Sequence, residues 1–161
     1  MREPTTPQGH SRWVTSGQRT PTEANYHMSF DPGMKTGWAS FDRSGKLTGS
    51  GIIQNGLYGV SDFLSGLREA PRVIIVETYR IKNFQHEHNM SKVPTIRVIG
   101  VLEDYAYRWQ SKWYEQEANA KDSGVRWAGW IPPKGHMPDD YSAVGHGVYW
   151  LHKNGLWEIE L

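Results

Sequence analysis

The feature that most constrains this chain is an aspartate that ends an apolar run and leads directly into a Gly-rich turn. Residues 30–38 read FDPGMKTGW, and a second aromatic-rich run begins after the turn. Residues 26–30 alternate apolar and polar side chains, which is the period of a half-buried strand. Asp31 is therefore expected at the end of a strand, where a carboxylate is held rigidly beside a loop. Asp-Pro-Gly also opens ordinary turns, so the motif alone leaves both interpretations open.

The hydrophobic patterns along the chain predict a mixed α/β fold. The predicted elements, in chain order, are strands over 26–30, 38–41 and 47–53, a helix over 57–67, a strand over 72–79, a helix over 95–109, a strand over 125–131 and a helix over 138–154. For residues 110–124, which are mostly polar, either a continued helix or a surface excursion fits. Three antiparallel strands come first and later strands alternate with helices, which predicts one mixed β-sheet flanked by helices.

Composition limits the classes of protein that this chain can belong to. With 161 residues, it has the length of one domain. Residues 1–25 are rich in Pro and polar residues and are expected to form a disordered or loosely attached tail, which leaves residues 26–161 as the folded domain. The absence of Cys excludes disulfides and thiolate zinc sites and fits a reducing, cytoplasmic location. No segment has the length and apolarity of a membrane span or signal peptide.

Three acidic positions on separate elements suggest a divalent-cation site. Glu77 directly follows the apolar run 73–76, where an unpaired carboxylate would be costly to bury, so it needs a cation or a partner such as Arg80. Asp139 and Asp140 begin the last predicted helix. Two-metal phosphodiester hydrolysis uses carboxylates that converge from different elements, and Mg²⁺ or Mn²⁺ suits such oxygen ligands.

The last predicted helix offers more than one candidate ligand. Asp139, Ser142 and His146 recur at spacings of three and four and therefore share one face. Asp140 lies about 100° away around the helix, so Asp139 is the better metal ligand and Asp140 the better N-terminal cap. His146 is a candidate for orienting a water or contacting phosphate, and a purely structural histidine fits the pattern equally well.

The motifs Phe30-Asp31-Pro32-Gly33, Thr36-Gly37-Trp38-Ala39, Glu77 after an apolar strand, and the acidic helix start that leads to Tyr149-Trp150-Leu151 together resemble the RuvC-like Holliday-junction resolvases. The likeness is greatest to the small phage-encoded members of this RNase H-like superfamily, and it spans residues 26–155. It implies an RNase H-like fold and Mg²⁺-dependent cleavage of branched DNA, such as four-way junctions in DNA recombination, usually by a homodimer. It also implies that Asp31 and Glu77 are the first two catalytic carboxylates, and that a phage-encoded member acts in the bacterial host's cytoplasm.

One position departs from the pattern of that family. Its last helix usually begins with two metal-site residues three apart, the second being an Asp before an Ala, whereas here Ser142 precedes Ala143. Three interpretations stay open: Asp139 and Asp140 together complete the site, His136 and Asp139 form the pair, or the chain is a catalytically weakened protein that binds branched DNA.

The segment after Glu77 is the predicted DNA-binding region. The formal net charge is only +1, so attraction to DNA requires a local basic patch. Basic residues gather in this segment, and aromatic residues between them are suited to stacking on unpaired bases. The predicted DNA-binding residues are Lys35, in the turn after Asp31, and Tyr79, Arg80, Lys82, Phe84, His86, Lys92 and Arg97.

Overall fold

The computed structural model describes residues 26–79, 86–131 and 134–157, with only the backbone at 86–88. Its elements, in chain order, are β1 (Tyr26–Asp31), β2 (Thr36–Asp42), β3 (Leu47–Ile53), α2 (Gly56–Ser65), β4 (Val73–Glu77), α3 (His86–Ser91), α4 (Val93–Trp109), β5 (Lys112–Gln116), α5 (Ala120–Trp127) and α6 (Asp139–Lys153). In the described part of the chain, no helix is long and apolar enough to cross a membrane.

The strands form one mixed five-stranded sheet in the order β3-β2-β1-β4-β5. The first three strands are antiparallel neighbours, as the hairpin patterns predict. β4 and β5 then extend the sheet in parallel to β1. This arrangement confirms the predicted α/β class, with a mixed sheet that begins with three antiparallel strands and is flanked by helices.

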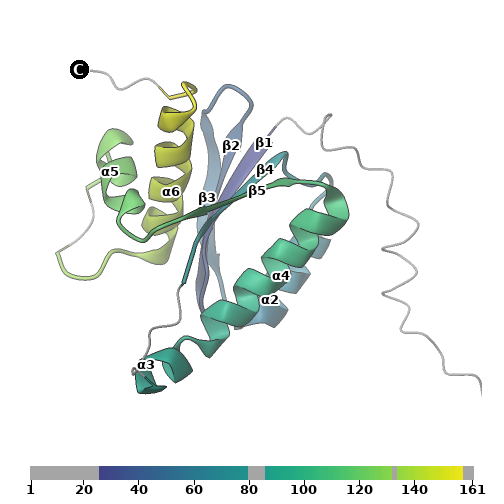
Figure 1. Cartoon of the computed structure of the whole chain (residues 1–161). Coiled ribbons are helices and arrows are strands. Elements are labelled where there is room, and N and C mark those ends of the chain that lie inside the picture. Colours follow the sequence, from purple (N-terminus) through teal and green to yellow (C-terminus); the bar gives the residue numbers. More distant parts are fainter. Residues whose placement is uncertain (1–25, 80–85, 132–133, 158–161) are drawn as a thin grey trace, which may run out of the picture.

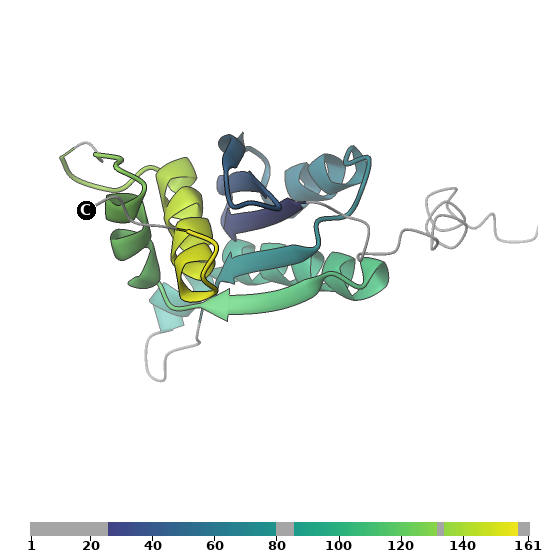
Figure 2. The ribbon, with the colours of Figure 1, turned by 90° about the horizontal axis from the view of Figure 1, so that it is seen from above.

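Helices cover both faces of the sheet, with α2 and α4 on one side and α5 and α6 on the other (Figures 1 and 2). Successive side chains of a strand point to opposite faces, so each strand contributes to two separate cores. Met28, Phe30 and Val76 pack under α2 and α4, whereas Phe41 and Ile75 pack under α6. In β4 both faces are therefore apolar, which accounts for its unbroken apolar run, whereas β1 places the polar residues His27 and Ser29 under α6.

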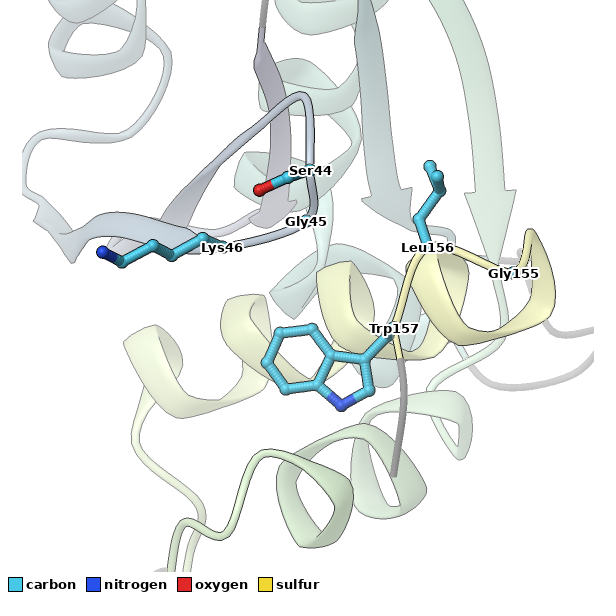
Figure 3. Close-up of a pocket in the computed structure, with 6 residues that line it drawn as sticks. All are labelled: Ser44, Gly45, Lys46, Gly155, Leu156 and Trp157. Atoms are coloured by element: carbon cyan, nitrogen blue, oxygen red, sulfur yellow. The ribbon is translucent and has the colours of Figure 1, made fainter. Parts of the chain in front are cut away.

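The turn between β2 and β3 packs against the segment that follows α6 (Figure 3). Gly45 has a φ of 93°, and a side chain there would overlap the backbone oxygen of Leu156. Asp42 holds the turn together, since its Oδ1 accepts hydrogen bonds from the backbone N–H groups of Ser44 (2.9 Å) and Lys46 (3.0 Å). The β2–β3 turn thus lies against the end of α6, at the end of the sheet where β1 begins.

The strand predicted over residues 125–131 is wrong. Residues 125–127 belong to α5, and a turn follows. The aromatic residues suggested a strand because they are large and β-prone, but they pack on α6: Trp127 stacks on Tyr149 at 5.7 Å between ring centroids, and Trp130 meets Tyr141 at 4.7 Å. Packing against a neighbouring helix therefore overrides the local β-propensity.

The interpretations of residues 110–124 as a continued helix or a surface excursion are also wrong, because the fifth strand lies there. β5 is the sheet edge next to β4, and its residues are exposed or half-buried. An edge strand has solvent on one side, so it carries polar and charged residues that a central strand would not tolerate. Its weak apolar pattern hides it in the sequence.

Candidate functional site

Asp31 and Glu77 lie side by side at the end of the sheet formed by the carboxyl ends of its parallel strands. They are the last residues of β1 and β4, which run parallel with Phe30 opposite Val76, so the next residue of each strand brings the two acids together. On the other side of β4, Gln116 ends β5 directly opposite Glu77. Three polar side chains thus converge at the carboxyl ends of three adjacent parallel strands, the edge at which open α/β sheets commonly bind ligands.

The hydroxyl group of Thr36 stabilises the turn after Asp31. Thr36 Oγ1 accepts a hydrogen bond from the backbone N–H of Gly33 (3.2 Å) and donates one to the Gly33 carbonyl (3.1 Å). At Gly37, a side chain would overlap the backbone carbonyl of Asp139. The Asp-Pro-Gly turn and the glycine after it therefore fix Asp31 and let the start of α6 approach the sheet closely.

Helix α6 supplies two buried side chains to this acidic pair. His146 is fully buried; its Nε2 lies 2.7 Å from Glu77 Oε2, and its Nδ1 lies 2.9 Å from Gln116 Oε1. Ser142, one turn earlier and equally buried, hydrogen-bonds Asp31 and lies 3.5 Å from Glu77 Oε2. The predicted shared face of Ser142 and His146 is thus the face that α6 presents to the two carboxylates.

Helix α5 adds a cation that the sequence did not reveal. Lys121 Nζ forms a 3.0 Å ion pair with Glu77 Oε2. The two helices pack in close backbone contact, because side chains at Gly124 and Gly145 would overlap the opposite helix backbone. This close approach brings the first turn of α5 over the end of β4 and places the ammonium group on the carboxylate.

The two carboxylates have opposite electrostatic environments. Burial raises the pKa of Asp31, and the neighbouring charge of Glu77 raises it further, against the opposing effects of Ser142 and Lys121. Burial alone would also raise the pKa of Glu77, but the hydrogen bond and charge of His146 and the Lys121 ammonium outweigh it and lower this pKa to about 2. Glu77 is therefore firmly ionised, whereas the surroundings of Asp31 disfavour its ionised form.

This pair of carboxylates fits a hard divalent cation. Mg²⁺ is commonly held by one or two carboxylates, with water and phosphate oxygens as its other ligands. The mutual repulsion that raises the Asp31 pKa is the kind of strain that a bound cation relieves. Within the described residues, however, no group of three or more His, Asp or Glu side chains is close enough to hold an ion together. The set Asp31, Glu77 and Asp139 therefore stays a prediction.

The start of α6 differs from the capping arrangement expected from the sequence. Pro138 occupies the N-cap position, and Asp139 and Asp140 form the first turn of the helix. The prediction that Asp140 caps this helix is wrong, because a residue inside the helix cannot take the extended backbone geometry of a cap. Both carboxylates still interact favourably with the helix dipole.

The predicted DNA-binding residues that the structure describes lie on several different elements. Lys35 is exposed in the turn after Asp31, and Arg97 is exposed in α4. Tyr79 donates a hydrogen bond from its hydroxyl to Asn89 Oδ1 in α3 at 2.7 Å. Lys92 is the N-cap residue of α4. Among the others, Arg80, Lys82 and Phe84 lie outside the described residues, and His86 is placed only by the backbone of α3.

Two residues of the site were missed by the sequence analysis. Gln116 carried a weak signal. The segment Lys112–Gln116 contains two adjacent aromatic residues and ends in a polar residue, just as β4 ends in Glu77. Lys121 carried no signal of its own, because an exposed-looking lysine in a polar segment is ordinary. Only the packing of α5 on α6 brings it to Glu77.

Comparisons with known proteins agree with this fold. No protein-family model matches the sequence, and no curated protein is similar to it in sequence. The structure is similar to RuvC from Thermus thermophilus in complex with a Holliday junction substrate, with a TM-score of 0.55 at 9% identity, over 83% of this chain and 98% of the other. It is also similar to a further RuvC structure from that organism, with a TM-score of 0.51 at 14% identity and the same coverage. The chain therefore has a RuvC-like fold.

Proposed function

We propose that this protein is a metal-dependent, structure-selective endodeoxyribonuclease that resolves Holliday junctions or other branched DNA. The observation that carries the proposal is the pairing of Asp31 with Glu77 at the carboxyl ends of β1 and β4. A RuvC-like fold with two half-buried, electrostatically coupled carboxylates at the carboxyl ends of β1 and β4 supports phosphodiester hydrolysis. The similarity to a RuvC bound to a Holliday junction supports branched DNA as the substrate.

The residues have distinct roles in this proposal. Asp31 and Glu77 hold Mg²⁺ or Mn²⁺, and Asp139 is the proposed third ligand. The chemistry that such a cation supplies when bound is activation of water and stabilisation of charge on phosphate oxygens. His146 and Gln116 orient the Glu77 carboxylate through their chain of hydrogen bonds, and Lys121 keeps it ionised. Asp140 contributes negative charge at the start of α6.

The decisive experiment is nicking of a synthetic four-way DNA junction by the Asp31→Asn variant. Asparagine keeps the shape of the side chain and its contact with Ser142 but removes the charge that would hold a cation. We expect nicking to fall to background and junction binding in EDTA to stay within about twofold of the native protein.

Asp62→Asn is the matched control, because Asp62 is an exposed acid of α2 on the other side of the sheet. This variant should nick at the native rate. Full nicking by Asp31→Asn would remove the carboxylate from the mechanism and overturn the proposal.

A second candidate function is binding of branched DNA with weakened catalysis. It is favoured by Ser142, which takes the place of an expected Asp, and by Lys121 and His146, which already satisfy Glu77 without a metal. Strong Mg²⁺-dependent nicking by the native chain would exclude it.

The Ser142→Asp variant separates the two candidates. A third carboxylate beside Asp31 and Glu77 should lower the melting temperature in EDTA, and Mg²⁺ should restore much of the loss by bridging the acids. Ser142→Asn, which adds similar bulk without charge, should show no such restoration. A large gain in nicking by Ser142→Asp identifies the native chain as the weakened form.

The remaining features of the proposal follow from the same resemblance. We propose a homodimer that presents two Asp31–Glu77 sites to a four-way junction, with DNA contacts from Lys35, Lys92, Arg97 and the segment after Glu77. A phage-encoded protein of this kind would act in the cytoplasm of its bacterial host. Cross-linking and sedimentation with and without junction DNA would test the dimer.

A further inference from the structure

A second candidate site lies at the opposite end of the sheet from Asp31 and Glu77. A cavity of about 390 Å³ opens where β1, β4 and β5 begin, beside the last turn of α6. Its lining residues come from all of these elements and from the turn after β2: His27, Arg43, Arg72, Val73, Lys112, Tyr114, Trp150, Asn154 and Leu156.

This cavity is separate from the candidate nuclease site. His27 and Asp31 lie four residues apart on β1, so both face α6 but at opposite ends of the strand. At about 3.3 Å per residue, their Cα atoms are roughly 13 Å apart. A ligand in the cavity therefore contacts neither Asp31 nor Glu77.

The charged residues that line the cavity are all cationic. They are Arg43, Arg72 and Lys112, and within the described part of the chain none of them forms an ion pair with an acid. The nearby acid Asp42 is engaged by its own turn, where Ser44 and Lys46 donate hydrogen bonds to it and lower its pKa. Three cations around one hollow, with no acid paired to them among the described residues, attract an anion.

His27 gives this cavity a buried polar group that lacks a partner. Only 4% of the residue is exposed, and neither ring nitrogen has a hydrogen-bond partner among the described residues. Burial and the charge of Arg72 lower its pKa against the smaller opposing effect of Asp42, so at neutral pH the ring offers one N–H donor and one lone pair. Leaving such a group unsatisfied is costly. Both ring nitrogens are closed to solvent, so a ligand oxygen in the cavity satisfies the donor once the ring turns towards it.

The aromatic residues indicate the rest of the ligand. Trp150 lies between His27 and Tyr114, with ring centroids 5.3 Å and 5.4 Å apart, respectively. Tyr114 lines the cavity and is 40% exposed. Aromatic faces beside Arg and Lys are the usual means of holding a nucleotide base and its phosphate. The cavity volume also falls within the range typical of small-molecule sites.

We propose that this cavity binds the phosphate group of a nucleotide, with Arg72, Lys112 and His27 on the phosphate and Tyr114 beside the base. The phosphate can belong to a free nucleotide or to a nucleotide within a DNA strand. A neighbouring hollow of about 470 Å³, which shares Leu156 with the cavity and is lined by Lys46 and Trp157, adjoins the site (Figure 3). A longer ligand therefore has space beyond the first phosphate.

The test is calorimetric titration of the full chain with thymidine 5′-monophosphate in EDTA. We expect binding of the nucleotide and none of thymidine, which lacks the phosphate. Arg72→Gln or Lys112→Gln should each weaken binding roughly tenfold, the usual effect of losing one charge-assisted hydrogen bond. Arg68→Gln removes the same charge from an exposed site outside the cavity and should change the affinity less than about twofold.

Two further arms complete the experiment. The Asp31→Asn variant should bind the nucleotide as the native chain does, because the cavity is separate from the nuclease edge. An unphosphorylated oligothymidylate that competes with the nucleotide would identify DNA phosphates as the ligand, whereas failure to compete would identify free or terminal phosphates. Absence of nucleotide binding at millimolar concentration, or unchanged binding by both Arg72→Gln and Lys112→Gln, would overturn the proposal whether or not the protein is a nuclease.

Discussion

At the scale of single residues, the site is governed by how each carboxylate is compensated. Glu77 is compensated twice, by the His146 ring and by the Lys121 ammonium, whereas Asp31 has the Ser142 hydroxyl and a like-charged neighbour. Two neighbouring acids at the carboxyl ends of adjacent strands thus have opposite pKa shifts. Such a split is typical of sites where charge has a function, because structure alone would be better served by neutral residues.

The low pKa of Glu77 has a consequence for stability in acid. Its folded pKa is about 2 against an ordinary value of 4.5, so its ionised form stabilises the folded state above pH 4.5, and this contribution is lost as the pH falls towards 2. The shift corresponds to at most about 3 kcal/mol. Urea unfolding at pH 6 and pH 3 should show a smaller acid loss for Glu77→Gln than for the native protein. Glu103→Gln, at an exposed position of α4, should behave as native.

The raised pKa of Asp31 predicts the opposite effect. A carboxylate with a folded pKa above 3.8 opposes folding once it is ionised, so its cost is present at neutral pH and absent below pH 3.8. Asp31→Asn should therefore raise the melting temperature at pH 7 while it abolishes nicking, a trade of stability for function. The gain should shrink as the pH is lowered to 3.5. A melting temperature at pH 7 below that of the native protein would contradict this account of the site.

At the scale of elements, the sequence predicted those strands whose pattern depends on their own residues. The alternation before Asp31 predicted β1, and the apolar run before Glu77 predicted β4, whose two faces are both covered by helices. Prediction from the sequence failed for β5 and α5, because the structure of these segments depends on the elements packed beside them. The polar edge strand β5 forms by pairing with β4, and the tryptophans of residues 127–130 are placed by packing on tyrosines of α6. Because α5 was not predicted, the role of Lys121 was not predicted either.

The close contact between α5 and α6 predicts that its glycines cannot be replaced. In Gly124→Ala, the added methyl group would overlap the Gly145 carbonyl and force the helices apart. We expect a loss of roughly 1–3 kcal/mol in unfolding free energy, as for other overpacked cores. The variant should also weaken the Lys121–Glu77 ion pair and raise the pKa of Glu77.

Gly100→Ala is the matched control for this contact. Gly100 lies inside α4, and nothing is within 4 Å of an added methyl group there. Alanine favours the helical backbone, so this variant should gain about 0.5–1 kcal/mol. Thermal unfolding of both variants measures the difference, and equal stabilities would show that α5 and α6 do not pack as described.

At the scale of the whole molecule, one sheet presents polar groups at both of its open ends. The carboxyl ends of β1 and β4 gather acids, and the amino ends of the same strands border a basic cavity. A net charge of +1 therefore conceals a strong internal separation of charge. Under the proposed function, attraction to DNA must come from local surfaces, and its salt dependence should reflect those few cations.

The two ends of the chain should differ in their importance for stability. Residues 1–25 have a composition that cannot bury much apolar surface, so a chain that begins at Ala24 should melt within about 2 °C of the native protein.

A chain that ends at Asn154 should melt several degrees lower, because it loses Trp157, which packs against the core under α6, and the backbone hydrogen bond from Leu156 to Leu151 (2.8 Å). It also loses the Leu156 wall of the basic cavity and should bind thymidine monophosphate more weakly. Differential scanning calorimetry measures the first effect and titration the second, and a strongly destabilised chain beginning at Ala24 would show that the folded domain extends into residues 1–25.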